Sequence, residues 1–340
     1  MNKDRKKLLN CCKNALEICL GAKEKDRVVI ISDKTTEDIT EGFLTLFKEL
    51  NLKYKSFDLD SFGKRPLSTL PSPIAKELSN CSISIFLAKK EPGELNLRFN
   101  ILNFVKQYKL RHAHMPGINL EMFIEGLNAD YRKVSKLQDI ILSYIKDGSV
   151  IRVTSSSGTD LNVKISEKYK WIKSDGIIRP GIWQNLPSGQ VFTTPDRVEG
   201  IFVADGSIGE WFSRKYPEIE KYPLKVEIRN SRIVRVESSN RSLASKFLLY
   251  IHSNQDGDRI GEFSFGTNIY MKNYTGNALH DENIPGVHIA AGDPLGYITG
   301  ADWTAKTRVS LIGKNTTVYI DDKEIIRDGN YIEEILDKLE

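Results

Sequence analysis

The spacing of apolar residues changes character close to residue 148, and this change constrains the fold more than any other feature of the sequence. Before it, apolar runs that predict strands alternate with stretches whose apolar residues recur every three or four positions, as in amphipathic helices. After it, most segments alternate between apolar and polar residues or are rich in β-branched residues, which indicates strands. We therefore predict an α/β fold with two domains, an α/β domain over residues 1–147 and a β-rich α+β domain over residues 148–340.

The first domain is expected to be Rossmann-like, because strands and helices alternate along it as they do in open parallel sheets. The sequence predicts strands at 27–33, 53–58 and 82–87, and helices at 8–19, 39–47, 74–78 and 120–145, the last broken near Gly126. No Gly-x-Gly-x-x-Gly follows the first strand, which counts against dinucleotide binding.

The second domain is expected to hold a cavity, because its polar residues cluster beside glycines on separated segments. These segments span residues 185–195, 260–268, 281–292 and 306–310. Strands are predicted at 150–154, 160–164, 224–229, 233–237 and 317–320, and helices at 243–251 and 331–339.

Composition limits the classes of partner. The 340 residues carry 49 basic and 45 acidic side chains, so the net charge of +4 favours neither nucleic acid nor a membrane surface. Three of the four cysteines share one predicted helix, where a disulfide framework is implausible, so we expect a reduced, cytoplasmic protein. The apolar residues of the N-terminus recur at helical spacing, which indicates neither a signal peptide nor a membrane span.

Two histidines stand two positions apart at His112 and His114. They would lie on one face only if the backbone is extended there. A metal pair is one interpretation, but two ligands cannot complete a site. The other interpretation is one buried, hydrogen-bonded histidine beside an exposed one.

A series of short motifs, taken in order, resembles the metallopeptidase family of aminopeptidase T and aminopeptidase S, of the thermophilic leucyl aminopeptidase type. The motifs are Arg111-x-Ala-x-Met-Pro-Gly117, Asp130-Tyr131, Ser157-Gly-Thr-Asp160, Asn185-Leu-Pro-Ser-Gly189 with Val191-Phe192, Asp205-Gly-Ser207, Gly261-Glu262, Gly266-Thr-Asn268, Asp281-Glu282 and Val287-His-Ile-Ala-x-Gly292. The resemblance covers nearly the whole chain. It implies a hydrolase with two metal ions in a cavity of the second domain, and a homodimer that encloses this cavity.

The resemblance also implies five metal ligands, of which this chain keeps two. The family's ligands are a Glu after Asn-Leu-Pro-x-Gly, the Glu of Gly-Glu, the His of Val-His-x-Ala, and a His-x-Asp pair. Glu262 and His288 stand at the second and third of these positions, whereas Gln190 replaces the first Glu. Arg308 and Ser310 replace the His and the Asp.

These replacements change the charge of the expected site. Two divalent ions bring about four positive charges, which carboxylates must offset. This chain keeps one such carboxylate, Glu262, and adds the guanidinium of Arg308, which cannot bind a metal. We therefore expect no metal cofactor, and we expect Arg308 to pair with Glu262. The alternative is one divalent ion, Zn, Co, Mn or Fe, on Glu262 and His288.

The sequence thus leads to an aminopeptidase-like protein that has lost the two-metal mechanism and acts on a small polar or carboxylate-bearing substrate. Glu262 and His288 are the candidate catalytic residues. The alternatives are an active aminopeptidase with a rearranged single-metal site acting on short peptides, a mononuclear iron ring-cleaving dioxygenase-like enzyme, and a non-catalytic binding protein. Asp281 and Glu282 suit ligand and turn-capping roles equally well. The candidate substrate-binding residues are Arg308, Gln190, Lys306, Tyr297 and Ser310.

Overall fold

The computed structural model describes residues 3–340 and divides into two compact units. The N-terminal unit comprises the described residues up to Arg132 together with Gly176–Ser188, and the C-terminal unit comprises Lys133–Asp175 and Gly189–Glu340. The chain therefore crosses between the units more than once, which differs from the single boundary expected between residues 147 and 148. Most of α6 (Tyr131–Tyr144) belongs to the C-terminal unit.

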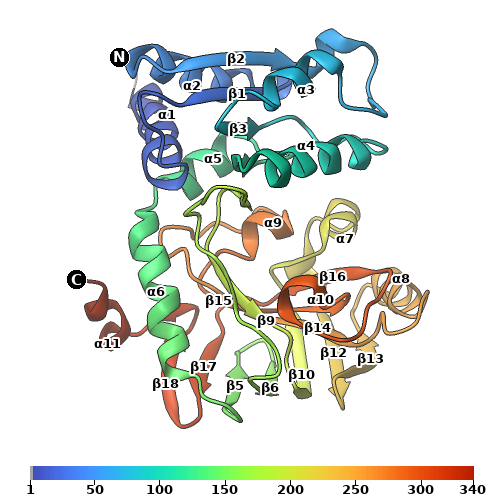
Figure 1. The fold of residues 1–340 in the computed structure, drawn as a ribbon. Coiled ribbons are helices and arrows are strands. Elements are labelled where there is room, and N and C mark those ends of the chain that lie inside the picture. The colour runs from blue at the N-terminus through green and yellow to red at the C-terminus, as the bar shows by residue number, and fades with distance from the viewer. Residues whose placement is uncertain (1–2) are drawn as a thin grey trace. The chain divides into compact units, whose positions relative to one another are not determined.

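The N-terminal unit is built on a five-stranded parallel sheet with the order β2-β1-β3-β4-β8. Figure 1 labels its strands β1, β2 and β3. The internal strand β1 is apolar from Val28 to Ile31 and buried on both faces, as is typical of a parallel sheet. This parallel sheet confirms the expected Rossmann-like α/β fold. The strands are β1 (Arg27–Ser32), β2 (Lys53–Asp58), β3 (Ile83–Phe86), β4 (Arg111–His114) and β8 (Trp183–Asn185).

Helical segments connect these strands. The first predicted helix is present as α1 followed by a π-helical turn, and the helix predicted over residues 120–145 is divided into α5 and α6. Helix α4 was not predicted, although its buried residues Leu97, Ile101 and Val105 are four positions apart. The segments are α1 (Lys3–Asn14), η1 (Ala15–Cys19), η2 (Lys34–Thr36), α2 (Glu37–Glu49), η3 (Leu59–Phe62), α3 (Ser72–Leu78), α4 (Leu95–Tyr108) and α5 (Leu120–Leu127).

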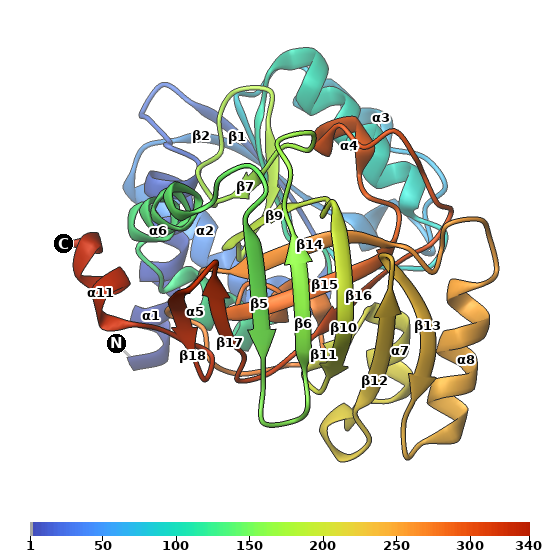
Figure 2. The ribbon, with the colours of Figure 1, turned by 90° about the horizontal axis from the view of Figure 1, so that it is seen from below.

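The C-terminal unit contains two antiparallel sheets. The eight-stranded sheet has the order β13-β12-β10-β6-β5-β17-β18-β19, and Figure 2 shows most of its strands side by side. Its strands are β5 (Val150–Thr154), β6 (Asp160–Lys164), β10 (Arg197–Ala204), β12 (Leu224–Arg229), β13 (Arg232–Glu237), β17 (Thr317–Ile320), β18 (Lys323–Arg327) and β19 (Asn330–Tyr331).

The six-stranded sheet has the order β11-β16-β15-β14-β9-β7 and shares one apolar core with the eight-stranded sheet. Buried residues such as Val153 and Val163 of one sheet and Phe263 and Ile289 of the other belong to this core. The strands of the six-stranded sheet are β7 (Ile172–Ser174), β9 (Gln190–Thr193), β11 (Ser207–Ile208), β14 (Ile260–Gly266), β15 (Gly286–Gly292) and β16 (Arg308–Ile312).

The remaining segments of the C-terminal unit are short, apart from α6 and α8. The terminal helix predicted over residues 331–339 is corrected, because Tyr331 lies in β19, where its hydroxyl donates to the Gly266 carbonyl at 2.7 Å. No helix within residues 3–340 is long and apolar enough to cross a membrane. The segments are α7 (Glu210–Lys215), η4 (Ile219–Lys221), α8 (Arg241–Ile251), α9 (Ala278–Asp281), α10 (Gly296–Thr299), α11 (Glu333–Leu336) and η5 (Asp337–Leu339).

Candidate functional site

The six-stranded sheet has one apolar face and one polar face, because successive side chains of a strand point to opposite sides. The apolar face packs into the shared core through Val191, Phe263, Phe265, Val287, Ile289, Val309 and Leu311. The strand register places Ser264 opposite His288, and Glu262 opposite Ala290, which is itself opposite Ser310. We call the other side the polar sheet face; it carries Gln190, Glu262, Ser264, His288, Arg308 and Ser310.

Small residues make room for the charged side chains of this face. The register of β14 against β15 shifts between Ile260 and Glu262, which marks a β-bulge at Gly261. A Cβ atom on Gly261 would lie 2.2 Å from the Gly292 carbonyl oxygen, so only glycine fits there. Gly292 lies opposite Arg308 and Ala290 opposite Glu262, so the intervening strand β15 offers no bulk between these two side chains.

Arg308 and Glu262 form an ion pair across β15. Nη2 of Arg308 lies 2.7 Å from Oε2 of Glu262, and the Glu262 side chain is only 2% exposed whereas that of Arg308 is 28% exposed. Burial by itself would lower the pKa of Arg308, but the negative charges of Glu262 and Glu282 raise it above its ordinary value. The guanidinium therefore keeps its charge beside the carboxylate.

One polar side-chain atom of Glu262 and one of Arg308 take no part in the ion pair. Within residues 3–340, neither Oε1 of Glu262 nor Nε of Arg308 has a hydrogen-bond partner, and both atoms are buried. A buried polar group without a partner is costly, so such atoms mark where a ligand or water would be bound. The pair thus offers a ligand one hydrogen-bond acceptor, Oε1 of Glu262, and one donor, the Nε–H group of Arg308.

A second set of hydrogen bonds lies beside this pair. Oε1 of Gln190 is 3.0 Å from Nε2 of His288 and 3.0 Å from the Ser264 hydroxyl, while Nε2 of Gln190 donates to Oε1 of Glu282 at 3.1 Å. Burial, followed by the positive charge of Arg308, lowers the pKa of His288 to about 3. His288 is therefore neutral at pH 7.

The polar sheet face brings some of the sequence-predicted residues together and leaves others apart. Gln190 and His288 share a hydrogen bond, Glu262 pairs with Arg308, and Ser310 lies buried on the same face. In contrast, Tyr297 is 80% exposed on α10. Lys306 is also exposed, and its backbone N–H donates to Asn254.

Sequence reasoning missed Ser264 and left Glu282 undecided. The spacing of Ser264 from Glu262 could have identified it, because residues two positions apart in a strand share a face. For Asp281 the turn-capping interpretation is supported, since its carboxylate accepts from the backbone N–H groups of Thr275 and Gly276. Glu282 instead reaches Gln190 on the polar sheet face. The one carboxylate and one guanidinium expected from the sequence would cancel each other, whereas Glu262, Glu282 and Arg308 together carry one net negative charge.

These side chains do not fit the pair of divalent ions that the resemblance implies. Oε2 of Glu262 accepts from the Arg308 guanidinium, whose positive charge would repel an ion bound to the same carboxylate, and Nε2 of His288 contacts the amide oxygen of Gln190. In the described part of the chain, no group of three His, Cys, Asp or Glu side chains is arranged to hold a metal ion. We therefore derive no reaction step through a metal.

The histidine pair of the N-terminal unit has the extended backbone that a shared face requires. Both rings are buried, and Nε2 of His112 lies 3.1 Å from Nδ1 of His114, while Nδ1 of His112 contacts the Ser84 hydroxyl at 2.7 Å. The prediction of one exposed histidine was therefore wrong. The two imidazole rings and the Ser84 hydroxyl thus form a buried chain of hydrogen bonds.

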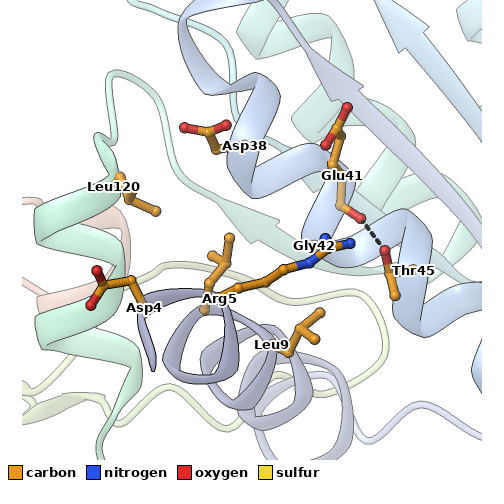
Figure 3. A pocket seen from close by; sticks show the side chains of 9 residues that line it. Asp4, Arg5, Leu9, Asp38, Glu41, Gly42, Thr45 and Leu120 are labelled. Carbon is orange, nitrogen blue, oxygen red and sulfur yellow. Dashed lines mark hydrogen bonds between the residues drawn. The ribbon is translucent and has the colours of Figure 1, made fainter. Parts of the chain in front are cut away.

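A separate hollow of about 360 Å³ lies in the N-terminal unit (Figure 3). Its lining is mixed, and it contains none of the residues predicted for the site. The residues lining it are Asp4, Arg5, Leu8, Leu9, Asp38, Glu41, Gly42, Thr45 and Leu120.

Comparison with known proteins gives a family and solved structures of similar fold. The family model described as thermophilic metalloprotease (M29) matches residues 129–322, more than half of the chain. The structure of 2,5-dihydroxypyridine dioxygenase from Pseudomonas putida KT2440 is similar with a TM-score of 0.69 and 14% identity, over 97% of this chain and 98% of that one. Wild-type AmpT from Thermus thermophilus is similar with a TM-score of 0.66 and 14% identity, over 96% and 99%. No curated protein matches the sequence.

Proposed function

Because this chain belongs to the thermophilic metalloprotease (M29) family, we propose that its polar sheet face is an aminopeptidase-like reaction site that works without a pair of metal ions. The site acts on a small polar or carboxylate-bearing substrate. The ion pair of Arg308 with Glu262, at 2.7 Å, is the observation that carries this proposal. The guanidinium supplies the positive charge that a metal would supply in the family, at the side chain that would bind it.

The two unpartnered atoms of the pair support a particular binding mode. The Nε–H group of Arg308 would donate to a carboxylate or carbonyl oxygen of the substrate, and Oε1 of Glu262 would accept from its hydroxyl or amino group. Charge-assisted hydrogen bonds of this kind are the stronger ones in proteins. Gln190 and Ser310 lie on the same face and complete the polar lining, whereas the exposed Tyr297 and Lys306 would act only at its margin.

Proton transfer is assigned to Glu262 and His288. A neutral histidine has one nitrogen lone pair and can accept a proton from a bound substrate. The low pKa of His288, about 3, makes it a weak base, so the reaction would need a substrate proton that is already acidic. This requirement favours a substrate with an activated hydroxyl or carbon acid over an unactivated peptide bond attacked by water.

A single divalent ion on Glu262 and His288 is the alternative within the same family. It would place the ion beside the Arg308 guanidinium, which already pairs with Glu262 at 2.7 Å, and the two positive charges would repel each other. The arginine pair is therefore the better-supported arrangement.

The test is ligand binding by chelator-treated protein. A panel of hydroxy acids, amino acids and short peptides would be screened by thermal shift, and the ligands that bind would be measured by calorimetry. Small carboxylates are expected to bind saturably to the wild type and at least tenfold more weakly to a double variant, Glu262→Gln with Arg308→Met, which removes both charges of the ion pair. Binding that survives in the double variant, or binding of peptides only after metal is added, would contradict the proposal.

A further inference from the structure

Glu282 follows helix α9 and is almost fully buried beside the polar sheet face. Its carboxylate accepts from the NH₂ of Gln190, and the amide oxygen of Gln190 contacts His288. We infer that Glu282 is a positioning residue, which acts through Gln190 to hold His288 with its proton on Nε2 and its lone pair on Nδ1.

The first step concerns the orientation of the Gln190 amide group. An ionised carboxylate can only accept hydrogen bonds, so the group that faces Glu282 at 3.1 Å must be the NH₂ of Gln190. The amide oxygen then necessarily points the other way. There it lies 3.0 Å from both the Ser264 hydroxyl and Nε2 of His288.

The second step concerns the proton of His288. An amide oxygen has no proton to give, so the contact at 3.0 Å is a hydrogen bond only if Nε2 of His288 donates. A neutral imidazole carries one proton, and the other ring nitrogen is then an acceptor. The lone pair is therefore on Nδ1. The hydrogen bond made by one ring nitrogen fixes the role of the other.

This relay depends on a glutamine at position 190. A carboxylate there would face Glu282 at the same distance and would repel it, because two ionised oxygens about 3 Å apart share no proton. An amide resolves the conflict, because its two ends suit a carboxylate on one side and a donor nitrogen on the other. The pairing of Gln190 with Glu282 thus turns His288 into a hydrogen-bond donor at Nε2.

The chemical consequence is that His288 can accept a proton only at Nδ1. The role of Nδ1 as the base rests on the proposed function, whereas the tautomer itself does not. A failure to find a carboxylate substrate would leave the tautomer unchanged. Conversely, the opposite tautomer would overturn this inference even if such a substrate binds.

Nitrogen NMR of the full-length protein, labelled with ¹⁵N at histidine, tests the inference directly. The chain has only five histidines, and a His288→Gln variant would identify the signals of His288 by their loss. Couplings of the two ring nitrogens to the ring carbon-bound protons distinguish Nδ1 from Nε2. The wild type is expected to show the Nε2–H form of His288, and a predominant Nδ1–H form would overturn the inference without any variant.

A pair of matched variants separates Glu282 from the other partner of Gln190. In Glu282→Gln, the new amide can either accept from Gln190 or donate to it, so the Gln190 amide is no longer held in one orientation and the Nδ1–H form of His288 should become populated beside the Nε2–H form. In Ser264→Ala, Glu282 remains and the Nε2–H form should persist. The inference is overturned if a folded Glu282→Gln variant keeps the wild-type pattern, or if Ser264→Ala loses it.

Discussion

Nη2 of Arg308 lies 2.7 Å from Oε2 of Glu262, across a strand that places only Gly292 and Ala290 between them. The arrangement explains how an arginine side chain can reach this buried carboxylate. The small residues of β15 let the guanidinium reach the buried carboxylate, and the charge of Glu262 is then balanced inside the protein.

Removing only one partner of this pair should therefore be destabilising. Arg308→Met leaves the Glu262 carboxylate buried without a counter-ion, and loss of one partner of a buried pair costs about 3 kcal/mol of unfolding free energy. Urea unfolding would measure it. Adding Glu262→Gln to this variant should recover most of the loss, because the buried charge of Glu262 is then removed as well, and equal stability of the single and double variants would contradict the account.

Arg65 holds a second, structural charge cluster in the N-terminal unit. Its side chain is 9% exposed and pairs with both Asp33 and Glu94, with Nε 2.9 Å from Oε1 of Glu94. Arg65→Ala should cost about 3 to 5 kcal/mol in urea unfolding, because it leaves two buried carboxylates unpaired. The control is Arg27→Ala, whose side chain is 40% exposed beside Glu77 and whose loss should cost less than about 1 kcal/mol. Similar losses in the two variants would refute this interpretation.

The buried histidine pair predicts sensitivity to acid. Burial lowers the pKa of His112 to about 3, while the unfolded chain has the ordinary value near 6.5. Between these values the unfolded state binds more protons, so the stability that is full above pH 6.5 falls as the pH falls toward 3. The contribution of His112 is about 1.4 kcal/mol per pH unit over this range. Unfolding free energies at several pH values should therefore decline less steeply in His112→Gln, and an unchanged slope would argue against a buried neutral His112.

Several strands, and the faces on which their side chains lie, could be predicted from the sequence. The alternation in residues 150–154 and 160–164 predicted β5 and β6 with correct limits, because one side of each strand lies in the core. Arg308 and Ser310 also stand two positions apart, and they lie on one face of β16. Period-two patterns report burial directly, which is why they could be interpreted without tertiary information.

Other features depend on contacts between distant segments, which local patterns do not record. Residues 176–188 belong to the N-terminal unit and add β8 beside β4, although the spacing of their apolar residues does not predict this. Glu282 comes from the segment after α9, and its contact with Gln190 spans 92 positions of sequence. The bulge at Gly261 is likewise visible only once β14 and β15 are paired.

Restoring the family's ligands should restore metal binding. The triple variant Gln190→Glu, Arg308→His and Ser310→Asp removes the guanidinium and supplies two carboxylates and an imidazole around Glu262 and His288. It should bind Zn²⁺ or Co²⁺ with at least one equivalent by calorimetry, because anionic oxygens and neutral imidazole are the ligands these ions take. Gln190→Glu alone keeps Arg308 and should bind none. If the triple variant binds no more metal than the wild type, the alignment of these positions with the family's ligands is wrong.

The measurement that tests the central claim most directly is the metal content of untagged protein after incubation with zinc, cobalt, manganese and ferrous iron, determined by elemental analysis. The account predicts no stoichiometric metal, because Arg308 already neutralises Glu262. About two equivalents would contradict it and indicate a two-metal peptidase. About one equivalent, displacing Arg308 from Glu262, would also contradict it and would indicate a single-ion hydrolase or an iron dioxygenase.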